Sequence, residues 1–197
     1  MLNIVLFGPP GAGKGTQADY IMARYNLVHL STGDLLRSEI VAGTRAGLKA
    51  KKLMDEGMLV PDEIVISMID SKIKSNASAS GFIFDGFPRT RQQATALDNL
   101  LHENKTSVTL TLSLEVNEEE LLKRLLKRGV MSGRADDANE TIIRNRIKQY
   151  FTNTEPLKQY YEEQDKLFRV DGVGKVDDIT TVLFELINQQ LSATKTM

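Results

Sequence analysis

The chain has 197 residues, of which 41% are hydrophobic and 26% are charged, a composition that indicates one globular domain and excludes a disordered chain. Its 25 lysines and arginines nearly balance its 26 aspartates and glutamates, so the net charge of -1 excludes a strongly basic binder of nucleic acid or membranes. The absence of cysteine excludes disulfide scaffolds, thiolate metal sites and cysteine nucleophiles.

The first predicted element is a buried strand at Leu2–Phe7, a short apolar run that stops at Gly8 and Pro9. No basic segment precedes this run, so it does not resemble a signal peptide. No later window approaches the run of about 18 apolar residues that a membrane helix needs. We therefore expect a cytoplasmic protein that binds no membrane.

Strands and helices alternate along the rest of the chain. Further strands are predicted at Val28–Ser31, Phe82–Asp85, Val108–Val116 and Leu167–Asp171. Helices are predicted at Lys14–Tyr25, Arg91–Glu103, Glu118–Arg128 and Ile179–Leu191. This alternation predicts an α/β fold of three layers, in which a parallel five-stranded sheet carries helices on both faces.

Three local patterns add detail to this fold. Apolar and hydroxyl residues alternate strictly from Val108 to Leu114, which is typical of a half-exposed strand, although helices are also able to cover small hydroxyl groups. Segments 31–60 and Gly129–Asp137 have the character of insertions, the second being a polar loop between charged helices. Asp137 and Glu140 have the spacing of a capping box, which predicts that the next helix starts there.

A glycine-rich loop, Gly8–Thr16, follows the first strand and opens the first helix. Glycines allow successive backbone N–H groups to point at phosphate oxygens, and the helix N-terminus adds a positive dipole. Lys14 supplies a charge for the β- and γ-phosphates of a nucleotide. Gly15 stands where the common pattern has Ser or Thr, so a hydroxyl ligand for Mg²⁺ comes one residue later, from Thr16. We predict a nucleotide-binding P-loop here.

Asp85 ends the predicted strand Phe82–Asp85. A carboxylate in this place beside a P-loop holds Mg²⁺ through bound water, and the alternative is that it caps the following turn. Arg89 follows Pro88, which stiffens the backbone, and its guanidinium offers two parallel donors to a phosphate. No zinc site is expected in a chain without cysteine.

Three motifs occur in a fixed order: the glycine-rich loop, Ser31–Arg37 and Asp85–Thr90. Together with Asn153–Leu157 and Val170–Gly172, they make the whole chain resemble the nucleoside monophosphate kinases, and among these the adenylate kinases. The resemblance implies the reversible conversion of MgATP and AMP into two ADP by a single P-loop kinase domain. It also implies an inserted AMP-binding segment at 31–60 and a mobile lid of the short form at 129–138.

The same resemblance implies roles for particular residues, in three groups. ATP is expected to contact Gly11, Ala12, Gly13, Lys14, Gly15, Thr16, Arg124, Arg128 and Gly174. AMP is expected to contact Thr32, Arg37, Met58, Val60, Gly86, Arg89, Gln93, Arg134 and Arg146. The charges expected to act in catalysis are those of Lys14, Arg89, Arg128, Arg134 and Arg146. The match at Arg146 requires one extra residue near Ala138.

Chemical reasoning agrees with this assignment at two points. Phosphoryl transfer is catalysed by positioning and by neutralising charge on oxygen atoms, so it requires converging arginines. Gln93 lies one helical turn after Arg89, and an amide, which both donates and accepts, is able to read the two polar edges of adenine. His29 and His102 are predicted to be packed or surface residues without a role.

Two alternatives remain open. One is a UMP or CMP kinase on the same fold, against which Thr32 and Gln93 favour AMP as acceptor. The other is a nucleotide switch or a non-catalytic nucleotide-binding protein. A GTP-dependent switch has an Asn-Lys-x-Asp motif, whereas Asn104–Ser107 lacks the final Asp, and a binding protein has no need of four arginines together. We expect a monomer whose partners are ATP, AMP and ADP, and no nucleic acid.

Overall fold

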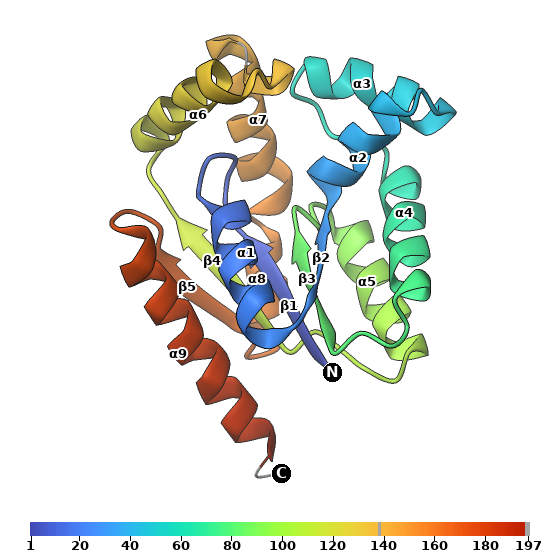
Figure 1. Ribbon diagram of the computed structural model, residues 1–197, viewed down its shortest axis with the longest axis vertical. Coiled ribbons are helices and arrows are strands. Elements are labelled where there is room, and N and C mark those ends of the chain that lie inside the picture. Colours follow the sequence, from blue (N-terminus) through green and yellow to red (C-terminus); the bar gives the residue numbers. More distant parts are fainter. Residues whose placement is uncertain (138, 196–197) are drawn as a thin grey trace.

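The computed structural model describes residues 1–137 and 139–195, and in these residues five strands form one parallel sheet (Figure 1). The strands lie in the order β2-β3-β1-β4-β5. Their bounds are β1 Leu2–Phe7, β2 Val28–Ser31, β3 Gly81–Asp85, β4 Leu110–Glu115 and β5 Leu167–Asp171. The predicted α/β fold is confirmed, and each predicted strand forms.

Helices cover both faces of the sheet (Figure 1). Those of the described residues are α1 Lys14–Tyr25, α2 Thr32–Val41, α3 Arg45–Asp55, α4 Asp62–Ser75, α5 Arg91–Glu103, α6 Glu118–Ser132, α7 Glu140–Gln149, α8 Leu157–Glu162 and α9 Val176–Lys195. Two shorter turns, the 3₁₀-helix η1 at Ala135–Asp137 and the π-helix η2 at Tyr150–Thr154, precede and follow α7. In the described part of the chain, no helix is both long and apolar enough to cross a lipid bilayer.

The central strand β1 shows why the sheet needs helices on both faces. All its residues are buried, and successive side chains point to opposite faces of a strand. Ile4 and Leu6 pack in a core with helices α1, α6, α7 and α9, whereas Val5 and Phe7 pack in a second core with α4, α5 and α8. An uninterrupted apolar run is therefore the pattern that this position requires.

Strand β4 is an interior strand, although its sequence alternates like that of a half-exposed one. It lies between β1 and β5, and the side chains of Thr111 and Ser113 are fully buried. The Ser113 hydroxyl donates to Glu115 Oε1 at 2.9 Å. Small hydroxyl groups fit under the neighbouring elements. The alternation of apolar and hydroxyl residues in β4 therefore reflects side-chain size and polarity, not exposure to solvent.

Two predictions for the segment between α6 and α7 are wrong. Helix α6 continues to Ser132, so the predicted loop at Gly129–Asp137 starts later, at Gly133, whose φ of 62° ends the helix. Asp137 does not cap α7, because Asn139 Oδ1 accepts the hydrogen bond from the backbone of Ile142. Residue 138 lies outside the described residues. The predicted lid at 129–138 ends there, and the match at Arg146 requires its extra residue near there.

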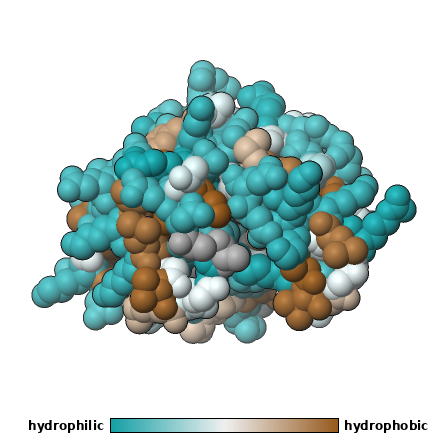
Figure 2. All heavy atoms as spheres, turned by 90° about the horizontal axis from the view of Figure 1, so that it is seen from above, coloured by the Kyte–Doolittle hydropathy of each residue, from teal (hydrophilic) through white to brown (hydrophobic). Residues whose placement is uncertain are grey.

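The carboxyl ends of the strands meet at one edge of the sheet. The loop after β1 lies there, flanked by the ends of β3 and β4, and this is where parallel α/β sheets bind ligands. Helices α2 and α3 rise over one side of this edge, and α6 and α7 over the other (Figure 1). Seen from above, the surface is mainly hydrophilic, with its hydrophobic residues in separate patches (Figure 2).

Candidate active site

A cavity of about 820 Å³ opens at this edge of the sheet. Its lining comes from the loop after β1, from α2, from the turn after β3 and from α6 and α7. Every residue that the sequence assigns to ATP, AMP, Mg²⁺ or catalysis lies in this lining. The fold thus brings all of them to one place, and their individual roles stay predictions.

The glycine-rich loop takes a backbone path that glycine permits. Gly11 and Gly13 have φ values of 86° and 94°, and a side chain on Gly11 would approach Leu125 Cγ to 2.9 Å. Gly13 precedes α1, and no side chain in the described residues caps the first turn of that helix. Its free N–H groups are therefore available to an anion.

Lys14 folds back across this loop, where Nζ donates to the backbone carbonyls of Gly8 at 2.7 Å and Pro9 at 3.0 Å. The pKa of Lys14 is lowered to about 8, because burial, together with the charges of nearby arginines, outweighs the opposing charge of Asp85. A cation that is short of solvent and close to other cations attracts phosphate oxygens strongly.

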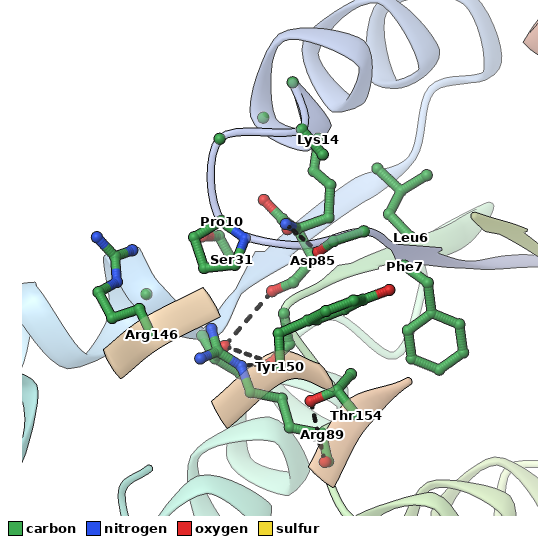
Figure 3. A pocket seen from close by; sticks show the side chains of 18 of the residues that line it. Leu6, Phe7, Pro10, Lys14, Ser31, Asp85, Arg89, Arg146, Tyr150 and Thr154 are labelled. Atoms are coloured by element: carbon green, nitrogen blue, oxygen red, sulfur yellow. Dashed lines mark hydrogen bonds between the residues drawn. The ribbon is translucent and has the colours of Figure 1, made fainter. Parts of the chain in front are cut away.

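Asp85 ends β3 beside Lys14 (Figure 3). Burial alone raises the pKa of the Asp85 carboxyl, but the contact with His29 and the charge of Lys14 outweigh it, so the pKa lies below its usual value. His29 Nε2 is 3.6 Å from Asp85 Oδ2. His29 was not predicted to have a role, because only the pairing of β2 with β3 brings it to Asp85.

The donor chemistry here fits Mg²⁺ held mainly by a nucleotide. Asp85 is an ionised carboxylate and Thr16 an exposed hydroxyl, both in the cavity lining. Among the described residues, no three acidic, His or Cys side chains form a cage for a metal ion. Mg²⁺ keeps several waters and takes one or two protein ligands plus phosphate oxygens, which suits this set.

Arg89 approaches the same space from the turn after β3, opposite Lys14 (Figure 3). Its Nε donates to the carbonyl of Gly86 at 2.7 Å, and the Thr32 hydroxyl donates to that carbonyl at 2.8 Å. Burial and the charge of Arg146 lower the pKa of Arg89. Arg146, from α7, also lines this part of the cavity.

Two aspartates hold the arginines of the α6–α7 region. Arg128 Nε and Nη2 donate to the two carboxylate oxygens of Asp137 at 2.6 and 3.1 Å. Arg146 Nη1 donates to Asp137 and, at 2.9 Å, to the backbone carbonyl of Asp136. The Asp136 carboxylate also faces Arg37 at 3.9 Å. Arginines that would otherwise repel one another are thereby gathered at one wall of the cavity.

Arg134 and Arg124 occupy the edges of this group. Arg134 Nη2 lies 3.8 Å from Asp34 Oδ1, a contact that joins the α6–α7 region to α2. Arg124 donates to Glu120 at 2.7 Å and to the carbonyl of Gly172 at 3.1 Å. The second bond ties α6 to the loop after β5, which carries Gly174.

Apolar and amide groups line the side of the cavity near α4 and α5. Val60 is buried, and Met58 is half-exposed beside Gln149, whose Nε2 is 3.7 Å from the Met58 sulfur. Gln93 is buried, and its amide bonds to the backbone of Arg89 and to Asp62. No sequence motif points to Asp62, since its contact with Gln93 spans 31 residues of the chain.

Comparison with known proteins decides which family this site represents. A family model described as adenylate kinase matches residues 6–166. The adenylate kinase of Flavobacterium psychrophilum is 50% identical over 188 residues, which cover 95% of this chain and 99% of the relative. The chain belongs to the adenylate kinase family. The adenylate kinases of Parabacteroides distasonis and Leptospira biflexa are 48% and 46% identical to this chain. Each match covers 95% of this chain, and the two cover 98% and 100% of the respective relatives.

Membership of the adenylate kinase family confirms the resemblance carried by the three motifs. The chain is therefore a phosphotransferase. The family match begins within β1 and ends just before β5, so it includes the glycine-rich loop, the arginines of the cavity and the α6–α7 region.

Proposed function

We propose that MgATP and AMP react directly in this cavity and give two molecules of ADP, reversibly. The observation that carries the proposal is the gathering of Lys14, Arg89, Arg128, Arg134 and Arg146 around one cavity that has a P-loop. Two nucleotides bring several negative phosphates into one space, and a group of cations of this size helps to neutralise them.

ATP occupies the P-loop side of the cavity. The N–H groups of the loop from Gly11 to Thr16 bind its phosphates, with Lys14 at the β- and γ-phosphates. Arg124 and Arg128 extend this contact from α6, and the backbone at Gly174 meets the adenine. The hydrogen bond from Arg124 to the Gly172 carbonyl supports this arrangement, because it holds the loop of Gly174 against α6.

AMP occupies the opposite side, between α2 and α5. Arg37, Arg89 and Arg146 bind its phosphate, Thr32 and Gly86 lie beside it, and Met58 and Val60 pack against its base. Gln93 reads the polar edge of adenine through its amide, and Arg134 reaches the phosphates from the lid. The side chains named here come from different elements but share one lining, which supports a single ligand in contact with all of them.

When bound, Mg²⁺ supplies charge neutralisation at the phosphate oxygens of ATP. Asp85, through water, and the Thr16 hydroxyl are the side chains that would hold it. The lowered pKa of the partly buried Asp85 carboxyl, which favours the ionised form, supports this assignment.

The reaction needs no general base. An oxygen of the AMP phosphate is already anionic, so it attacks the γ-phosphorus of ATP directly. The new phosphorus–oxygen bond forms as the bond to the β–γ bridging oxygen breaks, and the departing ADP carries the electron pair. The chain holds the reactants in line, stabilises the charge on the transferred group and excludes water.

The proposal also assigns the parts of the chain. Residues 1–197 act as one P-loop kinase domain, with segment 31–60 as the AMP-binding insertion and 129–138 as a short lid. The enzyme works as a cytoplasmic monomer that balances adenine nucleotides. The contact between Arg134 and Asp34 supports the pairing of lid and insertion, since it joins the two segments across the cavity.

The test follows nucleotides directly by ³¹P NMR. The enzyme with ATP, Mg²⁺ and AMP should form two ADP for each AMP consumed, and chelation of Mg²⁺ should stop the reaction. Lys14→Met should keep the fold and lower turnover by about 10²-fold or more, because one phosphate-directed charge is lost. Hydrolysis of ATP at the same rate without AMP, or near-normal turnover of Lys14→Met, would contradict the proposal.

A further inference from the structure

The side-chain amide of Gln93 is held at both ends by protein groups. Only 2% of Gln93 is exposed. Its Nε2 donates to Asp62 Oδ1 at 2.7 Å, and its Oε1 accepts from the backbone N–H of Arg89 at 2.8 Å. Gln93 lines the cavity, whereas Asp62, the first residue of α4, is outside the cavity lining formed by the described residues.

These two partners permit one orientation of the amide. A carboxylate offers acceptors alone, and a backbone N–H is a donor alone. If the amide turned by half a rotation, its oxygen would face Asp62 and its NH₂ group would face the Arg89 N–H, so both bonds would be lost. The carboxylate itself is fixed, because the Thr90 hydroxyl donates to Asp62 Oδ2 at 2.7 Å.

The orientation of this amide decides which purine it is able to read. Adenine presents the N6 donor beside the N1 acceptor, whereas a 6-oxopurine presents the O6 acceptor beside the N1–H donor. An amide that satisfies one edge must turn over to satisfy the other. After its two bonds to the protein, Gln93 retains one N–H and one oxygen lone pair, and in a fixed orientation this pair is able to satisfy only one of the two edges.

We propose that Asp62 is a positioning residue that sets the preference of the acceptor site for adenine over 6-oxopurines by fixing the Gln93 amide. The inference rests on the proposed function, in which Gln93 reads the base of AMP. IMP is the matched probe, because it differs from AMP only at the N1 and C6 edge of the base. GMP differs at a further position and is the less direct comparison.

The decisive variant is Asp62→Ala. Water in place of the carboxylate both donates and accepts, so in this variant the Arg89 N–H alone selects the amide orientation and the preference weakens. The ratio of kcat/KM for AMP to that for IMP should fall by about tenfold or more, the effect of losing one hydrogen bond to a charged group. The change should lie mainly in KM, since the Gln93 contact is present in the ground state.

Glu63→Ala is the control, because Glu63 is an exposed acid in the same first turn of α4. The ratio should stay unchanged in this variant. In a Gln93→Leu background, Asp62→Ala should change the ratio no further, since both residues act through one amide. Equal losses for AMP and IMP together with a lower melting temperature would show a structural role for Asp62 and overturn the proposal.

Failure of this inference is distinguishable from failure of the proposed function. A wild-type enzyme that prefers AMP, with an unchanged ratio in Asp62→Ala, overturns the role of Asp62 and leaves the reaction intact. A wild-type enzyme that does not phosphorylate AMP overturns both. Should Asp62→Ala not fold, ¹⁵N NMR of the wild type decides: one Gln93 amide proton should exchange slowly with solvent, and rapid exchange of both would overturn the proposal.

Discussion

Lys14 illustrates how one residue combines a chemical task with a cost to stability. Its ammonium group is partly buried beside the P-loop and bonds to two backbone carbonyls. Burial disfavours the charged form, so the pKa falls from 10.5 to about 8. The protein therefore holds the cation that the phosphates need at a position where its charged form is disfavoured in the free protein.

This pKa predicts the pH dependence of activity. Lys14 loses its positive charge as the pH rises through about 8, so kcat/KM for MgATP, which reports on the free enzyme, should fall above that pH. A guanidinium stays charged, so Lys14→Arg should lack this alkaline limb, whatever its absolute rate. Initial rates from pH 6 to 10 test the prediction, and an identical limb in both enzymes would assign it to another group.

The contribution of Lys14 to stability has the opposite sign. Between pH 8 and 10.5 the unfolded chain keeps the lysine proton and the folded chain releases it. The unfolded state then binds more protons, so this contribution to the free energy of unfolding rises with pH across that window. A fall in activity through loss of the Lys14 charge is thus separable from a fall through alkaline unfolding.

At the residue scale, the sequence predicts the residues that line the cavity but not the residues that hold those side chains in place. Lys14, Arg89 and the other predicted residues follow from local motifs and from a resemblance to the adenylate kinases. The spacing of Asp137 and Glu140 predicts a helix cap, but the Asp137 side chain is instead buried between Arg128 and Arg146. Such contacts join separate elements, and no local spacing encodes them.

At the element scale, the segment between α6 and α7 brings Arg134 to the lining of the cavity. Helix α6 ends at Ser132, Gly133 turns the chain, and Arg134 follows directly. The side chain of Arg134 is 32% exposed and touches Asp34 at 3.8 Å, whose own side chain is well exposed. A contact of this kind contributes little to folding, which leaves the guanidinium available to phosphates.

Arg134→Ala should lower kcat by about 10²-fold or more, the scale of removing one group that stabilises charge in the transition state. Both KM values and the melting temperature should change little, because the interaction is made mainly in the closed, reacting state. Arg144→Ala is the control, since Arg144 is an exposed arginine of α7 that pairs with Glu140 and lies outside the described cavity lining. An unchanged kcat in Arg134→Ala would move the role to Arg128, and a large fall in melting temperature would make Arg134 structural.

Periodicity predicted the existence of the elements better than their ends and surroundings. The alternation in β4 indicated one exposed face, yet neighbouring strands and helices bury both. The end of α6 was predicted too early, because Gly129 reads as a helix terminator. In the structure Gly129 lies within the helix, against the backbone of Asp137, where a side chain would not fit.

At the scale of the whole molecule, the strand order explains why distant motifs form one site. Strand β1 lies between β3 and β4, so the P-loop after β1 meets Asp85 at the end of β3. Helices α2, α6 and α7 come from either side of this edge, and with the turn after α6 they carry most of the remaining charges. A parallel α/β sheet makes this convergence predictable, whereas the ion pairs that complete it depend on the three-dimensional packing.

The central claim is that this cavity transfers phosphoryl groups to AMP in particular. The most direct measurement is kcat/KM of the wild-type enzyme with MgATP and each of AMP, CMP, UMP and GMP under identical conditions. AMP should exceed each of the others by at least about fivefold, the least effect expected when a buried polar edge is left without its partner. Equal or faster phosphorylation of CMP or UMP would contradict the account.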